Sequence, residues 1–181
     1  MVININMNHS FKIKSDNELD CEVVYFTNAN LIIDSGFKFK DFKIAYKTYG
    51  KLNSEKTNAI LVCHALTGDQ FVADKNPISN KNGWWDRMVG PNKPIDTNKY
   101  FVICSNVLGG CIGSTGPKET NLETKKIFGT DFPSITISDM VKAQKLLIDA
   151  LGIDNIFAVI GGSMGAMQVL QWSIDYPEKI I

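Results

Sequence analysis

Alternating apolar and polar residues mark the first strand pair of this chain. From Phe42 to Tyr49, Phe42, Ile44 and Tyr46 share one side with Thr48, and lysines occupy much of the other. This period of two predicts a strand with one buried face. The run Glu22 to Phe26 predicts another strand, and Asp34-Ser35-Gly36 supplies turn residues between the two. We therefore expect an antiparallel opening pair.

Three later runs are continuously apolar rather than alternating. They cover Ala59 to Ala65, Tyr100 to Ser105 and Ile156 to Ile160. Such runs are typical of strands that are buried on both faces, as in parallel sheets. A strand of this kind at a sheet edge would invite aggregation. We therefore expect a further strand to cover Ile156 to Ile160.

Helical spacing separates these runs. Ser138 to Leu151 carries one apolar stripe, with Thr136 or Ser138 as its N-terminal cap and Gly152 at its end. A second helical spacing follows Ser163 and stops at Pro177. This helix is predicted from four residues, Ala166, Met167, Leu170 and Ile174. A short helix is also expected from Asn82 to Val89.

This order predicts an α/β fold with a mostly parallel sheet and active-site loops at the carboxyl ends of its strands. Residues 1–20 are expected to form a loose N-terminal arm, and residues 21–181 the N-terminal part of one domain. The 181 residues suffice for one core or for a piece of a larger one.

The clearest chemical motif is Gly161-Gly162-Ser163-Met164-Gly165, a G-x-S-x-G sequence between a predicted strand and a predicted helix. A serine on such a turn adopts a strained backbone that exposes its hydroxyl. Gly161 and Gly165 lack the Cβ atoms that would collide there. We therefore interpret Ser163 as a nucleophile. The backbone amide of the next residue, Met164, lies at a helix N-terminus and is interpreted as half of an oxyanion hole. The alternative is a serine that merely caps the helix.

Composition excludes several other classes of function. Nineteen basic and nineteen acidic residues give a net charge of zero, which provides no electrostatic case for binding nucleic acid or an anionic membrane. The sequence has neither a signal peptide pattern nor a run long enough to span a bilayer. Cys21, Cys63, Cys104 and Cys111 show no C-x-x-C spacing, and we interpret them as reduced thiols of a cytoplasmic protein. With two histidines in the chain, no metal site is expected.

Other candidate residues have structural interpretations that we prefer. His64 could be a general base, but at a strand end it more often holds the adjoining loop through hydrogen bonds. The glycine-rich loop Asn106 to Pro117 lacks both nucleotide-binding glycine spacings, so it is expected to be a pocket wall or a plain loop. Asp131 and Asp139 are interpreted as helix caps or solvated charges. The paired tryptophans Trp84-Trp85 and the methionines are interpreted as core residues.

Several motifs together resemble the homoserine O-acetyltransferase family, which has the α/β-hydrolase fold. The likeness runs in consistent order from about residue 22 to the last residue. The motifs are His64-Ala65-Leu66-Thr67-Gly68, Gly83-Trp84-Trp85, Ile95-Asp96-Thr97, Asn106-Val107-Leu108-Gly109-Gly110-Cys111, Gly113-Ser114-Thr115-Gly116-Pro117 and the Ser163 pentapeptide. The chain departs from the family at Asn92 and Ala166, where glycine is more common.

The resemblance implies acyl transfer. Ser163 would take an acetyl group from acetyl-CoA as co-substrate and pass it to the hydroxyl of L-homoserine, a step of methionine biosynthesis, with no permanently bound cofactor. The backbone amides of Leu66 and Met164 would form the oxyanion hole. The family is cytoplasmic and dimeric, so a homodimer is expected of the full-length protein.

In the α/β-hydrolase fold, the catalytic triad residues follow one another along the chain as Ser, Asp and then His. No histidine follows Ser163, and Ile180-Ile181 has the pattern of a strand that has just begun. We therefore expect the triad Asp and His, and the family's lid, to lie beyond residue 181, with the chain incomplete at its C-terminus and inactive alone. The alternatives are an ester hydrolase, a homoserine succinyltransferase or serine acetyltransferase, and a truncated non-catalytic remnant or binding module.

Overall fold

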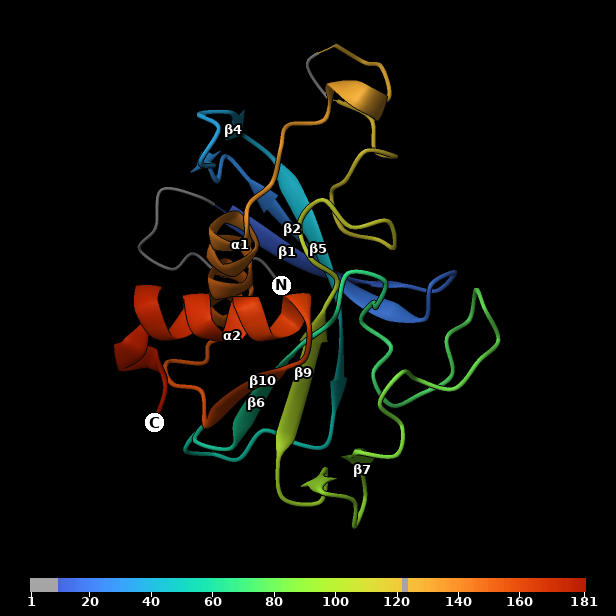
Figure 1. Ribbon diagram of the computed structural model, residues 1–181, viewed down its shortest axis with the longest axis vertical. Coiled ribbons are helices and arrows are strands. Elements are labelled where there is room, and N and C mark those ends of the chain that lie inside the picture. Colours follow the sequence, from blue (N-terminus) through green and yellow to red (C-terminus); the bar gives the residue numbers. More distant parts are fainter. Residues whose placement is uncertain (1–9, 122–123) are drawn as a thin grey trace.

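The computed structural model describes residues 10–121 and 124–181, and a six-stranded sheet dominates them (Figure 1). The sheet has the strand order β1-β2-β5-β9-β6-β10. Its strands are β1 (Ser10–Asp16), β2 (Cys21–Thr27), β5 (Phe42–Tyr49), β6 (Ala59–Cys63), β9 (Phe101–Ser105) and β10 (Ala158–Gly161). The pairs from β1 to β9 are antiparallel, and β6 runs parallel to both β9 and β10. The antiparallel opening pair is thus confirmed, and it leads into parallel strands.

Short elements complete the fold. Two small two-stranded sheets join β3 (Leu31–Ile32) to β4 (Lys38–Phe39) and β7 (Val89–Gly90) to β8 (Ile95–Asp96). The helices are α1 (Ile137–Ala150) and α2 (Met164–Asp175), with 3₁₀ turns η1 (Gly129–Asp131) and η2 (Pro177–Lys179).

The two faces of the sheet are covered differently. Both α-helices lie on one face, where α1 contributes Val141, Leu147 and Ile148 to the largest hydrophobic cluster. Side chains of the opposite face, Ile60 and Val62 among them, pack under the long connections that contain β7 and β8. Both central strands are therefore buried on both sides, as their continuous apolar runs predict.

Helix α1 begins as its sequence indicates. The Thr136 side chain accepts a hydrogen bond from the amide of Asp139, and the Asp139 carboxylate accepts one from the Thr136 amide. This reciprocal capping box satisfies two amides that the helix itself cannot pair. Gly152, at φ +68°, then ends the helix in a conformation that glycine tolerates.

The expected loose arm is wrong over Ser10–Asp16, which form the edge strand β1. Phe11 and Ile13 alternate with lysines and lie opposite Phe26 and Val24 of β2. This alternation is too short to predict a strand by itself. Cross-strand packing against the apolar residues of β2 stabilises the strand in the folded chain. Residues 1–9 of the expected arm lie outside the described part of the chain.

The short helix expected from Asn82 to Val89 is also wrong, since this segment forms turns that lead into β7. The amides of Trp84 and Trp85 donate to the carbonyls of Phe71 and Val72 instead of to a helix of their own. Tertiary partners therefore override the local preference. Both tryptophans pack, partly buried, against the cluster on that face of the sheet.

At the far edge, β10 does not reach the burial expected of a strand covered on both sides. All four of its residues are half-buried, and Ile156 just before it pairs in parallel with Ile180. Residues near Ile180 therefore pair beside this edge.

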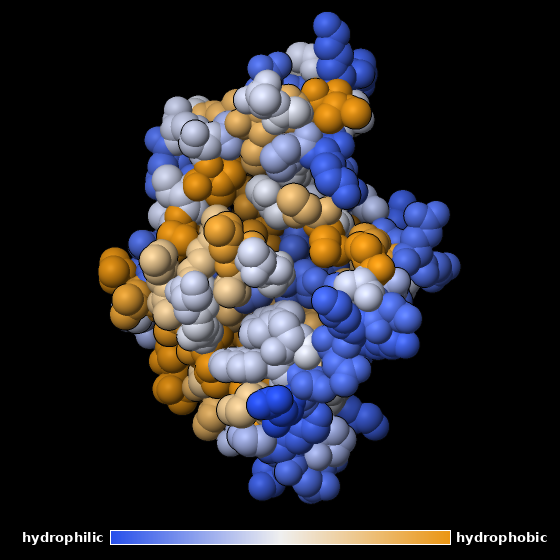
Figure 2. Space-filling view, turned by 45° about the vertical axis from the view of Figure 1, so that its right-hand side comes forward, coloured by the Kyte–Doolittle hydropathy of each residue, from blue (hydrophilic) through white to orange (hydrophobic). Residues whose placement is uncertain are grey.

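The stripe that predicts α2 lies on its outer side. Met167, Leu170 and Ile174 are 57%, 65% and 70% exposed, whereas Gly165, Gln168 and Trp172 face inward. Figure 2 shows apolar surface gathered on the side of the molecule where α2 lies, at the left of that view. Among the described residues, no helix is both long enough and apolar enough to cross a membrane.

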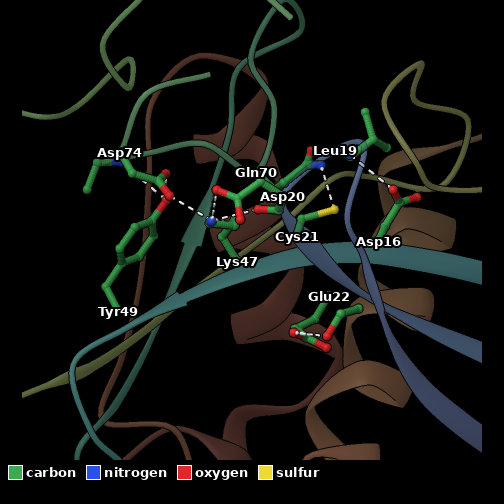
Figure 3. A network of polar contacts seen from close by, with 11 residues as sticks. Asp16, Leu19, Asp20, Cys21, Glu22, Lys47, Tyr49, Gln70 and Asp74 are labelled. Carbon is green, nitrogen blue, oxygen red and sulfur yellow. Dashed lines mark hydrogen bonds and ion pairs between the residues drawn. The ribbon is translucent and has the colours of Figure 1, made fainter. Parts of the chain in front are cut away.

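A polar network ties the connection after β6 to the sheet (Figure 3). The Lys47 ammonium lies 2.7 Å from one carboxylate oxygen of Asp74 and 3.2 Å from Asp20, and it also donates to the Asp20 carbonyl. The Tyr49 hydroxyl donates to the other Asp74 oxygen at 2.5 Å. Burial alone would lower the pKa of Lys47, but its bonds and attraction to Asp74 and Asp20 outweigh burial and raise it.

We expect Lys47→Met to lower the free energy of unfolding by about 1–3 kcal/mol, because the half-buried Asp74 loses its cationic partner. Chemical denaturation of the protein measures the change. Lys99→Met is the matched control, since Lys99 is 74% exposed and lies 3.7 Å from Asp96, and it should cost less than about 0.5 kcal/mol. Equal losses in the two variants would contradict the prediction.

Candidate active site

Ser163 occupies the sharp turn that joins β10 to α2. Its backbone has φ 57° and ψ −128°, a strained conformation for a residue with a side chain. The residue is exposed, and its side chain makes no capping hydrogen bond to the helix. The sharp, strained turn with an exposed serine that the sequence predicts is present, and the alternative of a helix-capping serine is wrong.

The elbow is possible because two backbones approach each other very closely. A Cβ atom on Gly165 would lie 2.1 Å from the Cys63 carbonyl oxygen, and one on Gly161 would lie 2.7 Å from the Gly165 backbone. Real Cβ atoms do not approach backbone atoms so closely, so both positions require glycine. Gly162 is different, because a Cβ there would meet nothing within 4 Å.

The parallel register brings the second predicted oxyanion residue to the same edge. Gly161 of β10 pairs with Cys63 of β6. Ser163 follows Gly161 by two residues and Leu66 follows Cys63 by three, so both lie just beyond the same end of the strand pair. Leu66 lies in the turn after β6 with its side chain exposed, and Met164 opens α2. Within the described residues, neither amide has a hydrogen-bond partner.

His64 holds this turn, as the structural interpretation predicts. Its buried ring places Nδ1 2.7 Å from the Ala65 carbonyl oxygen, and Nε2 lies 3.2 Å from the Val107 amide. Since an amide can only donate, Nε2 accepts and Nδ1 carries the proton. Burial lowers the pKa of His64, which keeps the ring neutral. Both ring nitrogens are occupied by backbone groups, so His64 is not placed as a base for Ser163.

The glycine-rich loop after β9 is fastened to β5. The Ser114 hydroxyl accepts from the Ala45 amide and donates to the Asn106 carbonyl, while the Thr115 hydroxyl accepts from the Lys43 amide. These bonds occupy the part of β5 that precedes its pairing with β9, which begins at Tyr46. They support the interpretation of a structural loop beside the site over that of a nucleotide cradle.

The two acidic residues considered from the sequence lie in other elements, Asp131 in η1 and Asp139 in the first turn of α1. Asp139 is buried in the capping box of α1, and Asp131 is exposed in η1. Asp175, at the end of α2, accepts from Gln171 at 2.8 Å. The cap and solvated-charge interpretations of the first two are thus confirmed.

Sequence reasoning missed two buried glutamines. Gln144 and Gln168 are almost completely inaccessible and hydrogen-bond to each other between α1 and α2. A signal was present in the sequence, because Gln144 interrupts the apolar stripe of the 138–151 helix. A polar residue on a buried face needs a partner, and its partner became visible only in the folded chain.

Residues 58–180 match the α/β-hydrolase fold. Together with the strand order and the Ser163 elbow, this match establishes the class. The chain belongs to the α/β-hydrolase family.

Within that class, the chain is similar to homoserine O-acetyltransferases. It is 63% identical over 150 residues to the enzyme of Nitrobacter hamburgensis, covering 83% of this chain and 38% of that one. Identity to the enzyme of Mesorhizobium japonicum is 56% over 171 residues, or 92% and 44% of the two chains. The chain thus spans roughly two fifths of the length of these curated relatives.

Solved structures place the chain beside both transferases and hydrolases. Homoserine O-acetyltransferase from Bacillus anthracis superposes with a TM-score of 0.77 at 33% identity, covering 96% of this chain and 44% of that one. Esterase E22 gives a TM-score of 0.76 at 34% identity, covering 99% and 46%. The resemblance stated from the motifs is therefore confirmed, and the fold is shared with an esterase.

We expect Gly165→Ala to destabilise the protein by about 1–3 kcal/mol, because the added methyl group forces the first turn of α2 away from Cys63. Gly162→Ala is the matched control, and it should change stability by less than about 0.5 kcal/mol. Thermal denaturation of both variants checks this. If both alanines were tolerated equally, the close approach would not be as tight as described.

We expect stability to fall as pH drops below about 6.5, the ordinary pKa of histidine, because the unfolded chain then binds a proton that native His64 does not. His64→Gln keeps an acceptor for the Val107 amide without titrating, so its stability should depend less on pH between 7 and 5. Denaturation midpoints across this range measure the difference. Parallel pH profiles would show that His64 is not held neutral.

Proposed function

We propose that the protein carrying this chain is a homoserine O-acetyltransferase that works through an acetylated Ser163. The observation that carries the proposal is the strained, exposed Ser163 at the end of β10. Such a geometry presents a hydroxyl to a substrate and leaves helix amides beside it. The names of the relatives supply the substrate class.

In the proposed first half-reaction, the Ser163 oxygen attacks the carbonyl carbon of the acetyl-CoA thioester. The bond from that carbon to sulfur breaks, and CoA leaves as the thiol with the proton that Ser163 gives up. In the second half-reaction, the hydroxyl oxygen of homoserine attacks the acetyl-enzyme. The bond from the acetyl carbon to the Ser163 oxygen breaks, O-acetylhomoserine, a methionine precursor, leaves, and the proton of the homoserine hydroxyl passes to Ser163. No redox change occurs.

Each half-reaction passes through a tetrahedral oxyanion, for which we propose the amides of Leu66 and Met164 as donors. Both lack partners within the described residues, and the Met164 amide belongs to the positive end of the α2 dipole. Removing one oxyanion donor typically costs on the order of 100-fold or more in turnover.

The proton acceptor for Ser163 is not supplied by His64, whose ring nitrogens are both occupied. The curated relatives are more than twice as long as the segment that matches this chain. We therefore assign the base and its orienting acid to the part of the protein that corresponds to the remainder of those relatives. The same proposal takes the protein to be a cytoplasmic homodimer.

We expect Ser163→Ala to abolish acetyl transfer by the full-length gene product and to prevent formation of an acetyl-enzyme. Incubation with acetyl-CoA alone should add one acetyl group to Ser163 of the natural protein, detected by mass spectrometry after acid quench. Homoserine should then remove the group and release O-acetylhomoserine. An alanine variant that still transfers acetyl groups would refute the proposal.

Ester hydrolysis is the second candidate function, favoured by the similarity to esterase E22. The same experiment separates the two, because a hydrolase releases CoA and acetate at a rate that homoserine does not change. Replacing acetyl-CoA by succinyl-CoA, or homoserine by serine, tests the remaining transferase alternatives.

A further inference from the structure

A chain of buried hydrogen bonds runs from the middle of α2, through α1, to the turn beside the elbow. The Trp172 indole N–H donates to Gln144 Oε1 at 2.8 Å, and Gln144 Nε2 donates to Gln168 Oε1 at 2.7 Å. Gln168 Nε2 then donates to the His64 carbonyl at 3.2 Å and to the Met164 carbonyl at 3.3 Å. These side chains are at most 1% exposed, and the proposed chemistry uses none of them directly.

The Trp172 end of this series of hydrogen bonds determines how both glutamine amides are oriented. An indole N–H can only donate, so it orients the oxygen of the Gln144 amide toward itself. The Cys63 thiol lies 3.9 Å from the same oxygen as a second, weak donor. The Gln144 nitrogen must then face the oxygen of Gln168, which leaves the Gln168 nitrogen facing the two carbonyls. Flipping either amide would oppose like groups in a site without exposure to water.

The far end of the chain lies at the site. The His64 carbonyl belongs to the turn that leads to Leu66, and the Met164 carbonyl belongs to the first turn of α2. One amide group therefore bonds to both segments that carry the proposed oxyanion donors. Gly165 approaches the Cys63 carbonyl between them, so a small shift of either segment changes their separation.

We propose that Gln168, oriented by Gln144 and Trp172, is a positioning residue that sets the spacing of the Leu66 and Met164 amides around the oxygen of the reacting carbonyl. This inference rests on the proposed acyl-enzyme chemistry and adds the residues that hold its oxyanion hole in register. Gln168 touches neither substrate nor the reacting atoms. It acts on the reaction through the His64 and Met164 carbonyls, to which its amide hydrogen-bonds.

The test uses the full-length gene product with Gln168→Met, which keeps the length of the side chain and removes its hydrogen bonds. We expect kcat for acetyl transfer to fall about 10- to 100-fold, because oxyanion stabilisation depends on donor placement. KM for acetyl-CoA should stay within about threefold. A boronic acid that forms a tetrahedral anion on Ser163 should bind correspondingly less tightly.

Gln171→Met is the matched control. Gln171 lies on the same helix, and its amide donates to Asp175 rather than to the site. This variant should keep kcat, KM and boronic acid affinity within about twofold of the natural protein.

Gln144→Met provides a second, independent variant, because it removes the group that orients Gln168 without touching the turn. It should give a smaller fall in kcat with the same unchanged KM, and the double variant should be no slower than Gln168→Met alone. Such non-additivity is expected of residues that act through one link.

A folded Gln168→Met protein with natural kcat, or with a fall in kcat matched by a rise in KM, would overturn the inference. Failure of both glutamine variants to fold would overturn it too. The hydrogen bonds of Gln144 and Gln168 would then stabilise the fold instead of placing the Leu66 and Met164 amides. Failure of the proposed function is seen separately, as acetylation that survives Ser163→Ala.

Discussion

The site depends on one steric constraint, the contact between the first turn of α2 and the end of β6. Gly165 brings the helix backbone against the Cys63 carbonyl, closer than any side chain would permit. The chain can then leave β10, turn at Ser163 and enter the helix within three residues. The strain at Ser163 is held in place by that packing. Exposure of the hydroxyl is therefore a consequence of how closely two backbones meet.

The parallel register then makes the site a shared property of two strands. Because Gly161 pairs with Cys63, the turns that follow β10 and β6 emerge side by side at one edge of the sheet. His64 and the Gln168 amide both fasten this edge with neutral groups. Neutral hydrogen bonds suit so buried a place, since a buried ion would carry a large desolvation cost.

The periodicity of the sequence predicted the central elements because their environment is simple. Continuous apolar runs became β6 and β9, with boundaries shifted by one or two residues, and the 138–151 helix was found with its cap. The prediction failed where the local structure depends on segments that are distant in the sequence. Ser10–Asp16 became a strand through pairing with β2, and Trp84 lies in a turn because its amide bonds to Phe71.

The sequence by itself determined the elbow, because a glycine-flanked serine between an apolar run and a helical spacing allows few other geometries. It also indicated the family and the structural role of His64. The tertiary structure alone decided that the apolar stripe of α2 faces outward and that its inner side carries Gln168. Periodicity shows which residues share a helix face, but not which face meets the sheet. That choice follows from the close contact at Gly165 and from hydrogen-bond partners far away in the sequence.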